Sequence, residues 1–234
     1  KKAATLAERL ALSMNALVDR ETLAMELWPH AEFNRARNNL YSTISRLRSA
    51  LGPTPDGKSC VLIQNECIGL NGDYVKTDVR LFEQMTREIL GNRGGARGPH
   101  LVELCLKVEQ LYAGSLYIPN GCNPTYFVRM RHIMQSKFID SMIRGANEAL
   151  EENDLQSAIW LVEAGLRQET AREDMVRCAM RVYNAAGRRR DIIDLYSGHV
   201  HHPKEQIAGV PEPETRRLYE RLVEGRLNRV LVER

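Results

Sequence analysis

Residues 33–52, with the sequence FNRARNNLYSTISRLRSALG, carry four arginines and no acidic residue. Over the whole chain of 234 residues, by contrast, 33 Lys and Arg are nearly balanced by 30 Asp and Glu. A guanidinium group binds a phosphate through paired hydrogen bonds and also recognises the edge of guanine, while asparagine recognises adenine. The composition of this segment therefore predicts a polyanionic partner, and double-stranded DNA is the partner that these side chains suit.

Apolar residues in this segment recur at the spacing of one helical face. They are Ala36, Leu40, Ile44, Leu47 and Leu51. We expect Asn34 to cap the start of the helix, and Gly52 followed by Pro53 to end it. The opposite face carries small and cationic polar residues, which are Arg35, Asn38, Ser42, Ser45, Arg46 and Ser49.

Such a face is suited to the major groove of DNA, which is about 12 Å wide. Small serines allow close approach, so that arginine and asparagine can reach the base edges. Arg37 and Arg48 lie on the flanks of the face, where phosphates are the expected partners. The alternative is that this is the ordinary charged face of a surface helix. The two helices before it, the hairpin after it and the absence of acidic residues argue against that alternative.

Two shorter helices precede the basic segment. The first is indicated by a stripe at spacings of four, four and three, which consists of Leu6, Leu10, Met14 and Leu17. The second is indicated by RETLAMELWP, where Leu23 and Leu27 share a face and Pro29 prevents continuation. Together with residues 34–51 they make three helices, joined by short connections.

A β-hairpin is predicted after the third helix. The stretch CVLIQNECIGLNGDYVKTD is rich in β-branched residues and is interrupted at Asn65-Glu66 and at Asn71-Gly72. Three helices followed by a hairpin predict a winged helix-turn-helix with a C-terminal β-hairpin wing over residues 1–76.

Residues 77–234 are expected to be helical. The stretch GNRGGARGP at 91–99 has no Gly-Lys-Ser/Thr after a strand, so it indicates a linker and not a phosphate loop. Residues separated by 34 positions correspond, as in Asn153 and Gly187 or Ile159 and Ile193, which is the period of tetratricopeptide-like (TPR-like) helix pairs. Two apolar stripes on REDMVRCAMRVYNAAGR indicate a helix packed on both sides. The predicted fold class is therefore mainly α, with a winged helix-turn-helix followed by a TPR-like α-helical domain over 77–234.

The N-terminal region resembles the OmpR/PhoB-type winged helix of the SARP family of antibiotic regulatory proteins, in the motifs LW, ARNNL and ISRLRSALG. Later stretches are similar to the bacterial transcriptional activation domain (BTAD) of that family, namely DVRLFEQM, VEQLYAGSLY, REDMVRCAMRVYNAAGR and PEPETRRLYERL. The resemblance implies a transcription activator that binds promoter DNA, often at direct repeats, and helps RNA polymerase to engage. It places Ser42 and Arg46 toward the bases, and Asn38, Ser45 and Arg48 toward the phosphate backbone.

Two departures from the family accompany the resemblance. The family has a small β-sheet before its first helix, which here is either absent or upstream of Lys1, so the completeness of the DNA-binding domain stays open. The Gly-Tyr of the second wing strand appears as Cys67-Ile68, and Glu66 at the wing tip is expected to repel phosphates.

The number of phosphate contacts predicts the binding strength. About four phosphate contacts give a salt slope near −3.6, which predicts weak binding by one copy. Binding as a dimer or in tandem, or a contact with RNA polymerase or a sigma factor, would compensate.

Other functions find little support in the sequence. No G-x-S-x-G, H-E-x-x-H or nucleotide-binding loop is present, which argues against an enzyme, and no cofactor is indicated. His199, His201 and His202 have no nearby Cys, Asp or Glu at ligand spacing, so no metal site is predicted. The five cysteines are scattered and are expected to be buried free thiols. The sequence shows neither a membrane span nor a secretion signal, so no membrane partner and a cytoplasmic location are expected.

A second function stays open beside DNA binding. In that alternative, the TPR-like helices form a protein-interaction scaffold, and a degenerate winged helix binds protein in place of DNA. Tyr126 and Trp160 are interpreted as core packing, although they could line a partner groove. The run Arg188-Arg189-Arg190 is interpreted as a solvated turn, with an acidic surface of the polymerase or sigma factor as the sharper alternative.

Overall fold

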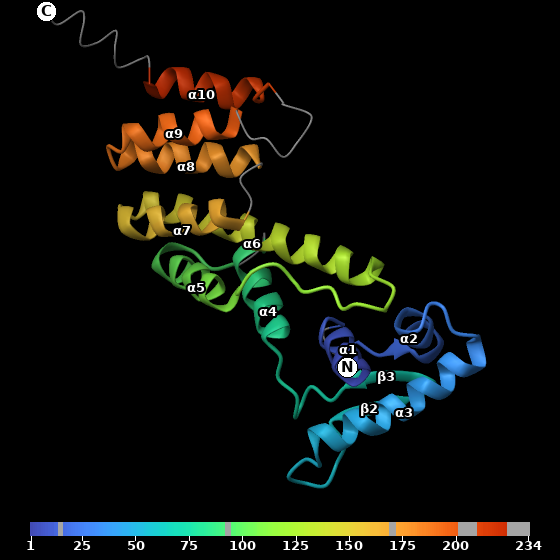
Figure 1. Ribbon diagram of the computed structural model, residues 1–234. Helices are drawn as coiled ribbons and strands as arrows, with labels where there is room; N and C mark the ends of the chain where they lie inside the picture. Colours follow the sequence, from blue (N-terminus) through green and yellow to red (C-terminus); the bar gives the residue numbers. More distant parts are fainter. Residues whose placement is uncertain (14–15, 92–94, 169–171, 201–209, 224–234) are drawn as a thin grey trace, which may run out of the picture. The chain divides into compact units, whose positions relative to one another are not determined.

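The computed structural model describes residues 1–13, 16–91, 95–168, 172–200 and 210–223, which contain ten helices and three strands. The helices are α1 Lys2–Ala11, α2 Arg20–Leu27, α3 Phe33–Leu51, α4 Asp78–Leu90, α5 Gly98–Leu111, α6 Thr125–Glu151, α7 Leu155–Gln168, α8 Glu173–Ala185, α9 Arg189–Val200 and α10 Pro213–Val223 (Figure 1). The strands are β1 Val18–Asp19, β2 Val61–Gln64 and β3 Cys67–Leu70. The described residues are mainly α-helical, as predicted.

The chain divides into two compact units, one of residues 1–84 and 115–134 and the other of residues 85–114 and 135–234. In the first unit, α1, α2 and α3 pack with the sheet around a core of twelve buried residues. They are Leu6, Leu10, Leu23, Ala24, Leu27, Ala36, Leu40, Ile44, Leu47, Val61, Ile68 and Leu70. The division into domains at residues 76 and 77 stays a prediction.

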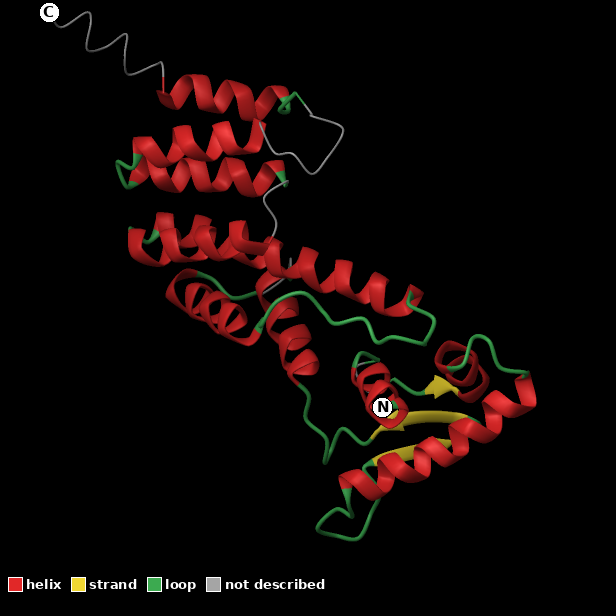
Figure 2. Cartoon of the chain, in the orientation of Figure 1, coloured by secondary structure: helices red, strands yellow, loops and turns green. Residues whose placement is uncertain are grey.

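The hairpin prediction is confirmed, with β2 and β3 antiparallel and Ile63 opposite Ile68. Its turn residues Asn65 and Glu66 have φ angles of 45° and 65°, the left-handed pair that a two-residue hairpin turn requires. The short strand β1 adds a third strand, so the sheet order is β1-β3-β2 (Figure 2). Sequence periodicity could not show β1, because two residues are too few to define a period of two.

Three details of the predicted helices are wrong. The first helix ends at Ala11, and Leu17, expected on its stripe, is 39% exposed beside the strand β1; Met14 lies outside the described residues. The third helix begins at Phe33 behind Glu32, so Asn34 is not its cap. Leu51 is 42% exposed, because the last turn of α3 extends past the core. Gly52, with φ of 73°, ends α3 as expected.

Residues 115–134 complete the first unit. The amide of Asn123 donates to the carbonyl of Glu26 at 2.7 Å, and the hydroxyl of Tyr126 donates to the carbonyl of Leu12 at 3.1 Å. Arg9, only 4% exposed, pairs with Glu26 at 2.6 Å and lies 3.4 Å from the ring centre of Tyr126. The buried guanidinium is thus compensated by a carboxylate and an aromatic face.

The repeat of 34 residues is visible in the turns of the second unit. Asn153 and Gly187 both have left-handed φ angles, of 60° and 71°. The amide that follows each of them donates at 2.8 Å to a carbonyl five residues earlier, from Asp154 to Ala149 and from Arg188 to Tyr183. Equivalent helix ends therefore recur with the predicted period.

The helices α7, α8, α9 and α10 pack as consecutive layers (Figure 2). The helix α8 contacts all three of the others and buries residues on both of its sides, as predicted. Its buried residues are Met175, Val176, Cys178, Ala179, Met180, Val182 and Tyr183. Where α7 approaches α8, a side chain at Gly165 would meet the sulfur of Met175 at 2.5 Å, so a larger residue there would require the Met175 side chain to move.

Candidate nucleic-acid interface

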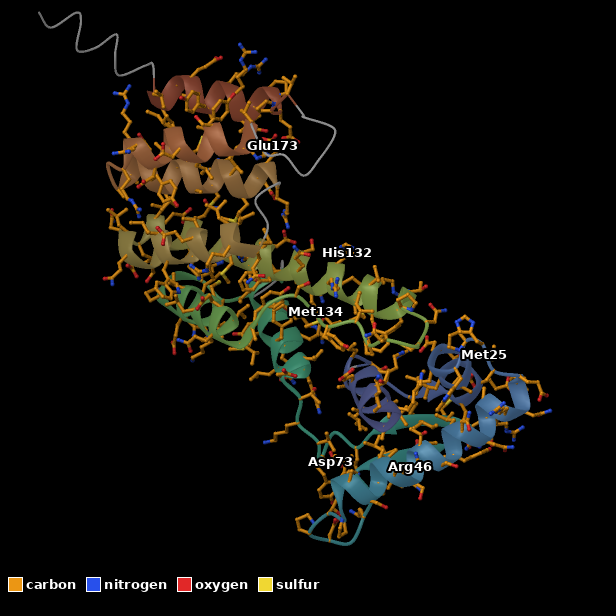
Figure 3. The ribbon with its side chains drawn as sticks, viewed as in Figure 1. Met25, Arg46, Asp73, His132, Met134 and Glu173 are labelled. Carbon is orange, nitrogen blue, oxygen red and sulfur yellow. The ribbon has the colours of Figure 1, made fainter. Side chains whose placement is uncertain are left out.

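The helix α3 is held to the first unit by one face, which leaves the opposite face open. Its buried residues are Ala36, Leu40, Thr43, Ile44 and Leu47. The seven residues predicted to contact DNA are all exposed on α3, and they are Arg35, Arg37, Asn38, Ser42, Ser45, Arg46 and Arg48. Figure 3 labels Arg46 on this helix. These residues are exposed at the helical spacing predicted from the sequence, but their contact with DNA stays a prediction.

Arg35 and Arg46 form no ion pair or side-chain hydrogen bond with any other described residue. The arginines of the second unit behave differently, since many of them pair with carboxylates: Arg167, Arg172, Arg177, Arg188, Arg190 and Arg216. Ser42 donates to the carbonyl of Asn38 at 3.3 Å, which keeps its side chain close to the helix. The outward face of α3 is therefore a shallow cationic surface with two uncompensated guanidinium groups.

The flank of α3 beside the hairpin is more tightly connected. Arg48 donates to the carbonyl of Val61 on β2 at 3.1 Å, and Arg37 donates to the hydroxyl of Tyr41 at 3.4 Å. Both arginines remain exposed. They were expected at phosphate positions; the structure places Arg48 where α3 meets β2 and Arg37 beside Tyr41 of the same helix.

A hollow of about 550 Å³ lies at the C-terminal end of α3. It is lined by Arg48, Ser49, Gly52, Pro53, Gly57, Lys58 and Ser59. Lys58 pairs with Asp56 at 2.9 Å, which raises the pKa of Lys58. Hydrogen bonds from Thr54 first, then from Tyr74 and Lys58, lower the pKa of Asp56. Lys58 was not among the residues predicted from the sequence to bind DNA, although it lies in the polar turn between α3 and β2.

A second cationic cluster lies beside the hairpin turn. Arg20 donates to the hydroxyl of Tyr41 at 2.7 Å and pairs with the carboxylate of Glu66 at 2.8 Å. Hydrogen bonds from Arg37 and Arg20 lower the pKa of Tyr41, and the bond to Tyr41 raises the pKa of Arg37. Glu66 was expected to repel phosphates from the wing tip; in the structure it pairs with Arg20, because the hairpin turn brings it to the start of α2.

Other residues considered from sequence have ordinary structural partners. His199 pairs with Glu173 at 3.0 Å, while residues 201 and 202 lie outside the described part. The interpretation of Trp160 as core packing is wrong, since it is 52% exposed, whereas Tyr126 is half-buried. Of the run 188–190, only Arg188 lies in the turn, where it pairs with Glu163 and with Asp191, whereas Arg189 and Arg190 begin α9.

The five cysteines are free thiols. Cys105, Cys122 and Cys178 are buried, and Cys60 and Cys67 are half-buried. Among the described residues, no three side chains of His, Cys, Asp or Glu gather as metal ligands. None of the described helices combines the length and the apolar character that crossing a membrane requires.

Comparison with solved structures finds a likeness to EmbR of Mycobacterium tuberculosis, solved in complex with a low-affinity phosphopeptide. The TM-score is 0.70 and the sequence identity 16%, a level that shows a shared fold. The match covers 96% of this chain and 59% of the EmbR chain, so the present chain spans little more than half of that protein. No curated protein matches the chain.

Comparison with protein families finds a match at the level of sequence. Residues 77–223, more than half of the chain, match the model of the bacterial transcriptional activator domain. The match contains the stretches DVRLFEQM and REDMVRCAMRVYNAAGR and all the helices from α4 to α10. The chain belongs to the bacterial transcriptional activator domain family.

Proposed function

We propose that this chain is a DNA-binding transcription regulator, and an activator in particular. Residues 1–76 act as its winged helix, in which α3 enters the major groove of promoter DNA. Residues 77–234 engage the transcription machinery or modulate the DNA-binding unit. Membership of the activator-domain family supports the regulatory part of this proposal, and the chemistry of α3 supports the DNA-binding part.

The observation that carries the proposal is the uncompensated charge on the outward face of α3. Arg35 and Arg46 are exposed, and no described carboxylate pairs with either. A protein surface ordinarily gains from having both signs interspersed, so a face of one sign is suited to a charged partner. The small side chains of Ser42 and Ser45 leave room for base edges between the two arginines.

The binding strength of one copy is expected to be low. Four arginines at phosphates or bases release about four counterions, which gives a salt slope near −3.6 and weak binding at physiological salt. Two copies on adjacent sites would double that slope and raise occupancy through effective concentration. A contact between residues 77–234 and RNA polymerase or a sigma factor would also raise the occupancy of the DNA site.

The decisive experiment uses purified protein and fragments of the genome that encodes it. Fragments retained by the wild type are sequenced, and the binding of a retained duplex is then measured by fluorescence anisotropy with Arg46→Ala. Loss of a base contact costs about 1–3 kcal/mol and relaxes the preference at one base position. Arg190→Ala removes an arginine whose side chain is 92% exposed but lies outside α3, and it should leave binding unchanged.

The interaction-scaffold alternative makes the opposite prediction. If residues 1–76 bind protein in place of DNA, no fragment is enriched even at low salt, and Arg46→Ala behaves as the wild type does. That result would overturn the proposed DNA binding while leaving the family assignment intact.

A further inference from the structure

We propose that Arg20, Arg37 and Tyr41 together bind one phosphate group of the DNA backbone. In the free protein, the carboxylate of Glu66 occupies the place of that phosphate. This inference rests on the proposed function, since it names a second contact of the same DNA-binding unit. It differs from the contacts expected of α3 alone, because Arg20 comes from α2 and Glu66 from the hairpin turn.

The hydroxyl of Tyr41 is the centre of the site. It accepts hydrogen bonds from Arg20 at 2.7 Å and from Arg37 at 3.4 Å, which occupy its two lone pairs. Its own hydrogen has no acceptor among the described residues. Tyr41 is 39% exposed, so this hydrogen is available to an acceptor that arrives from solvent. Two guanidinium groups beside a free O–H form a donor set suited to a phosphate oxygen.

Glu66 shows that the site already holds an anion. Its carboxylate oxygen lies 2.8 Å from a terminal nitrogen of Arg20, and its side chain is 69% exposed while that of Arg20 is 12% exposed. The carboxylate thus covers Arg20 from the solvent side. The carboxylate is the exposed partner of this pair, so another anion that arrives from solvent can replace it at Arg20.

The backbone at Glu66 supports this assignment. Glu66 occupies the second position of the hairpin turn with φ of 65°, where glycine is the favoured residue and a glutamate is strained. The amide of Arg20 also donates to the carbonyl of Glu66 at 3.0 Å, which holds the turn against the start of α2. A strained glutamate kept beside a cationic cluster points to a use for its carboxylate.

The site lies on the flank of α3 where a DNA backbone would pass. Arg37 and Tyr41 are four residues apart, so they occupy one side of the helix, on the flank across the outward face from Arg46. A helix in the major groove has a phosphate backbone along each flank. The replacement of Glu66 by a phosphate would therefore accompany insertion of α3.

The test measures duplex binding against salt concentration for Glu66→Gln, with Asp73→Asn as the matched control. Asp73 is an exposed carboxylate of the same unit, labelled in Figure 3, that follows β3 whereas Glu66 precedes it. We expect Glu66→Gln to bind about three- to tenfold more tightly at low salt, with a salt slope steeper by about 0.9. Asp73→Asn should change the affinity by less than about twofold, because distant exposed charges are screened.

A second variant separates a specific site from general electrostatics. Tyr41→Phe should weaken binding about two- to tenfold, as expected for the loss of a hydrogen-bond donor. In the Tyr41→Phe background, the gain from Glu66→Gln should fall to less than half, because the two residues act on one site. Thermal melts of each variant verify that it is folded.

The outcomes distinguish this inference from the proposed function. If the wild type binds duplex DNA and Arg46→Ala weakens it, but Glu66→Gln matches Asp73→Asn, the phosphate site is refuted and DNA binding stands. An unchanged gain in the Tyr41→Phe background also refutes the site. If the wild type binds no duplex at all, the proposed function fails and the phosphate site fails with it.

Discussion

At the scale of single residues, the pair of Arg9 and Glu26 is a buried structural constraint in the first unit. The guanidinium is 5% exposed at its side chain and the carboxylate 19%, with 2.6 Å between them. Breaking a pair of this kind leaves a buried charge without compensation. Arg9 also contacts the ring of Tyr126, so the pair links α1, α2 and the start of α6.

We therefore expect Glu26→Ala to lower the free energy of unfolding by about 2–3 kcal/mol, measured by urea denaturation. The control is Asp194→Ala, which removes a pair 3.8 Å apart whose side chains are 92% and 69% exposed. The control should cost less than about 0.5 kcal/mol. Equal effects of the two substitutions would contradict the compensating role of Glu26.

A second prediction at this scale concerns the thiols. Burial raises the pKa of Cys105 to about 12 and that of Cys178 to about 11, from an ordinary value of 9.0. At pH 8, iodoacetamide should therefore modify the half-buried Cys60 and Cys67 well before Cys105 and Cys178, as followed by mass spectrometry. Urea should make all of them react. Fast alkylation of Cys105 in the native protein would contradict its burial.

The same raised pKa values give a pH dependence of stability. The thiols of Cys105 and Cys178 are protonated in the folded protein, and the unfolded chain loses these protons near pH 9. Their contribution is therefore complete below about pH 9, and it is lost as the pH rises from there toward 12.

At the scale of elements, replacing a glycine by alanine should change stability in opposite directions in a turn and in a helix. Gly187 has φ of 71°, and a side chain there would meet no atom within 4 Å, so backbone conformation alone favours glycine. Gly198 in α9 also has free space but no such φ angle. We expect Gly187→Ala to destabilise by about 1 kcal/mol, and Gly198→Ala to stabilise by about 0.5–1 kcal/mol.

Urea denaturation of both variants gives the check. The two changes add the same methyl group, one in the turn before α9 and one within α9, so opposite signs isolate the effect of the turn. Stabilisation by Gly187→Ala would show that the left-handed turn is not required.

Elements with a clear period were predictable from sequence. The stripe of Ala36, Leu40, Ile44 and Leu47 placed α3 correctly, and Asn65-Glu66 placed the hairpin turn. The strand β1 was not predictable, because its two residues acquire strand geometry only by pairing with β3. For the same reason the length of α1 was overestimated, since the chain must leave the helix to reach β1.

The candidate site was predictable in part. The exposed face of α3 follows from helical periodicity, which is local. The cluster of Arg20, Tyr41 and Glu66 does not, because residues far apart in sequence meet only when the hairpin turn packs beside α2. The single local signal was Arg37 and Tyr41 at helical spacing, with a phenol next to a guanidinium.

At the scale of the whole molecule, the first unit needs residues that lie beyond the winged helix proposed for 1–76. The segment 115–134 supplies the amide of Asn123 and the hydroxyl of Tyr126 to α2 and to the end of α1. Without this segment, Arg9 loses its contact with the ring of Tyr126. Residues 1–76 alone should therefore be less stable than the same residues in the intact chain.

The expected result is that a fragment of residues 1–76 melts at a lower temperature, or without cooperativity, in circular dichroism. Adding a peptide of residues 115–134 should raise its melting temperature in proportion to the logarithm of peptide concentration, because a ligand of the folded state stabilises it. A peptide with Tyr126→Phe serves as a weaker ligand. A fragment that melts like the intact chain, with no response to the peptide, would contradict the role of this segment.

The dependence on residues 115–134 has a consequence for biosynthesis. On the ribosome, the nascent helices α1 to α3 emerge well before the segment that completes their unit. At about 5–20 residues per second, synthesis from residue 76 to residue 134 takes roughly 3–12 s. During that interval the buried positions of Arg9 and Glu26 are open to water and to chaperones. The newly made protein thus gains its compact first unit only after residues 85–114 of the second unit have been translated.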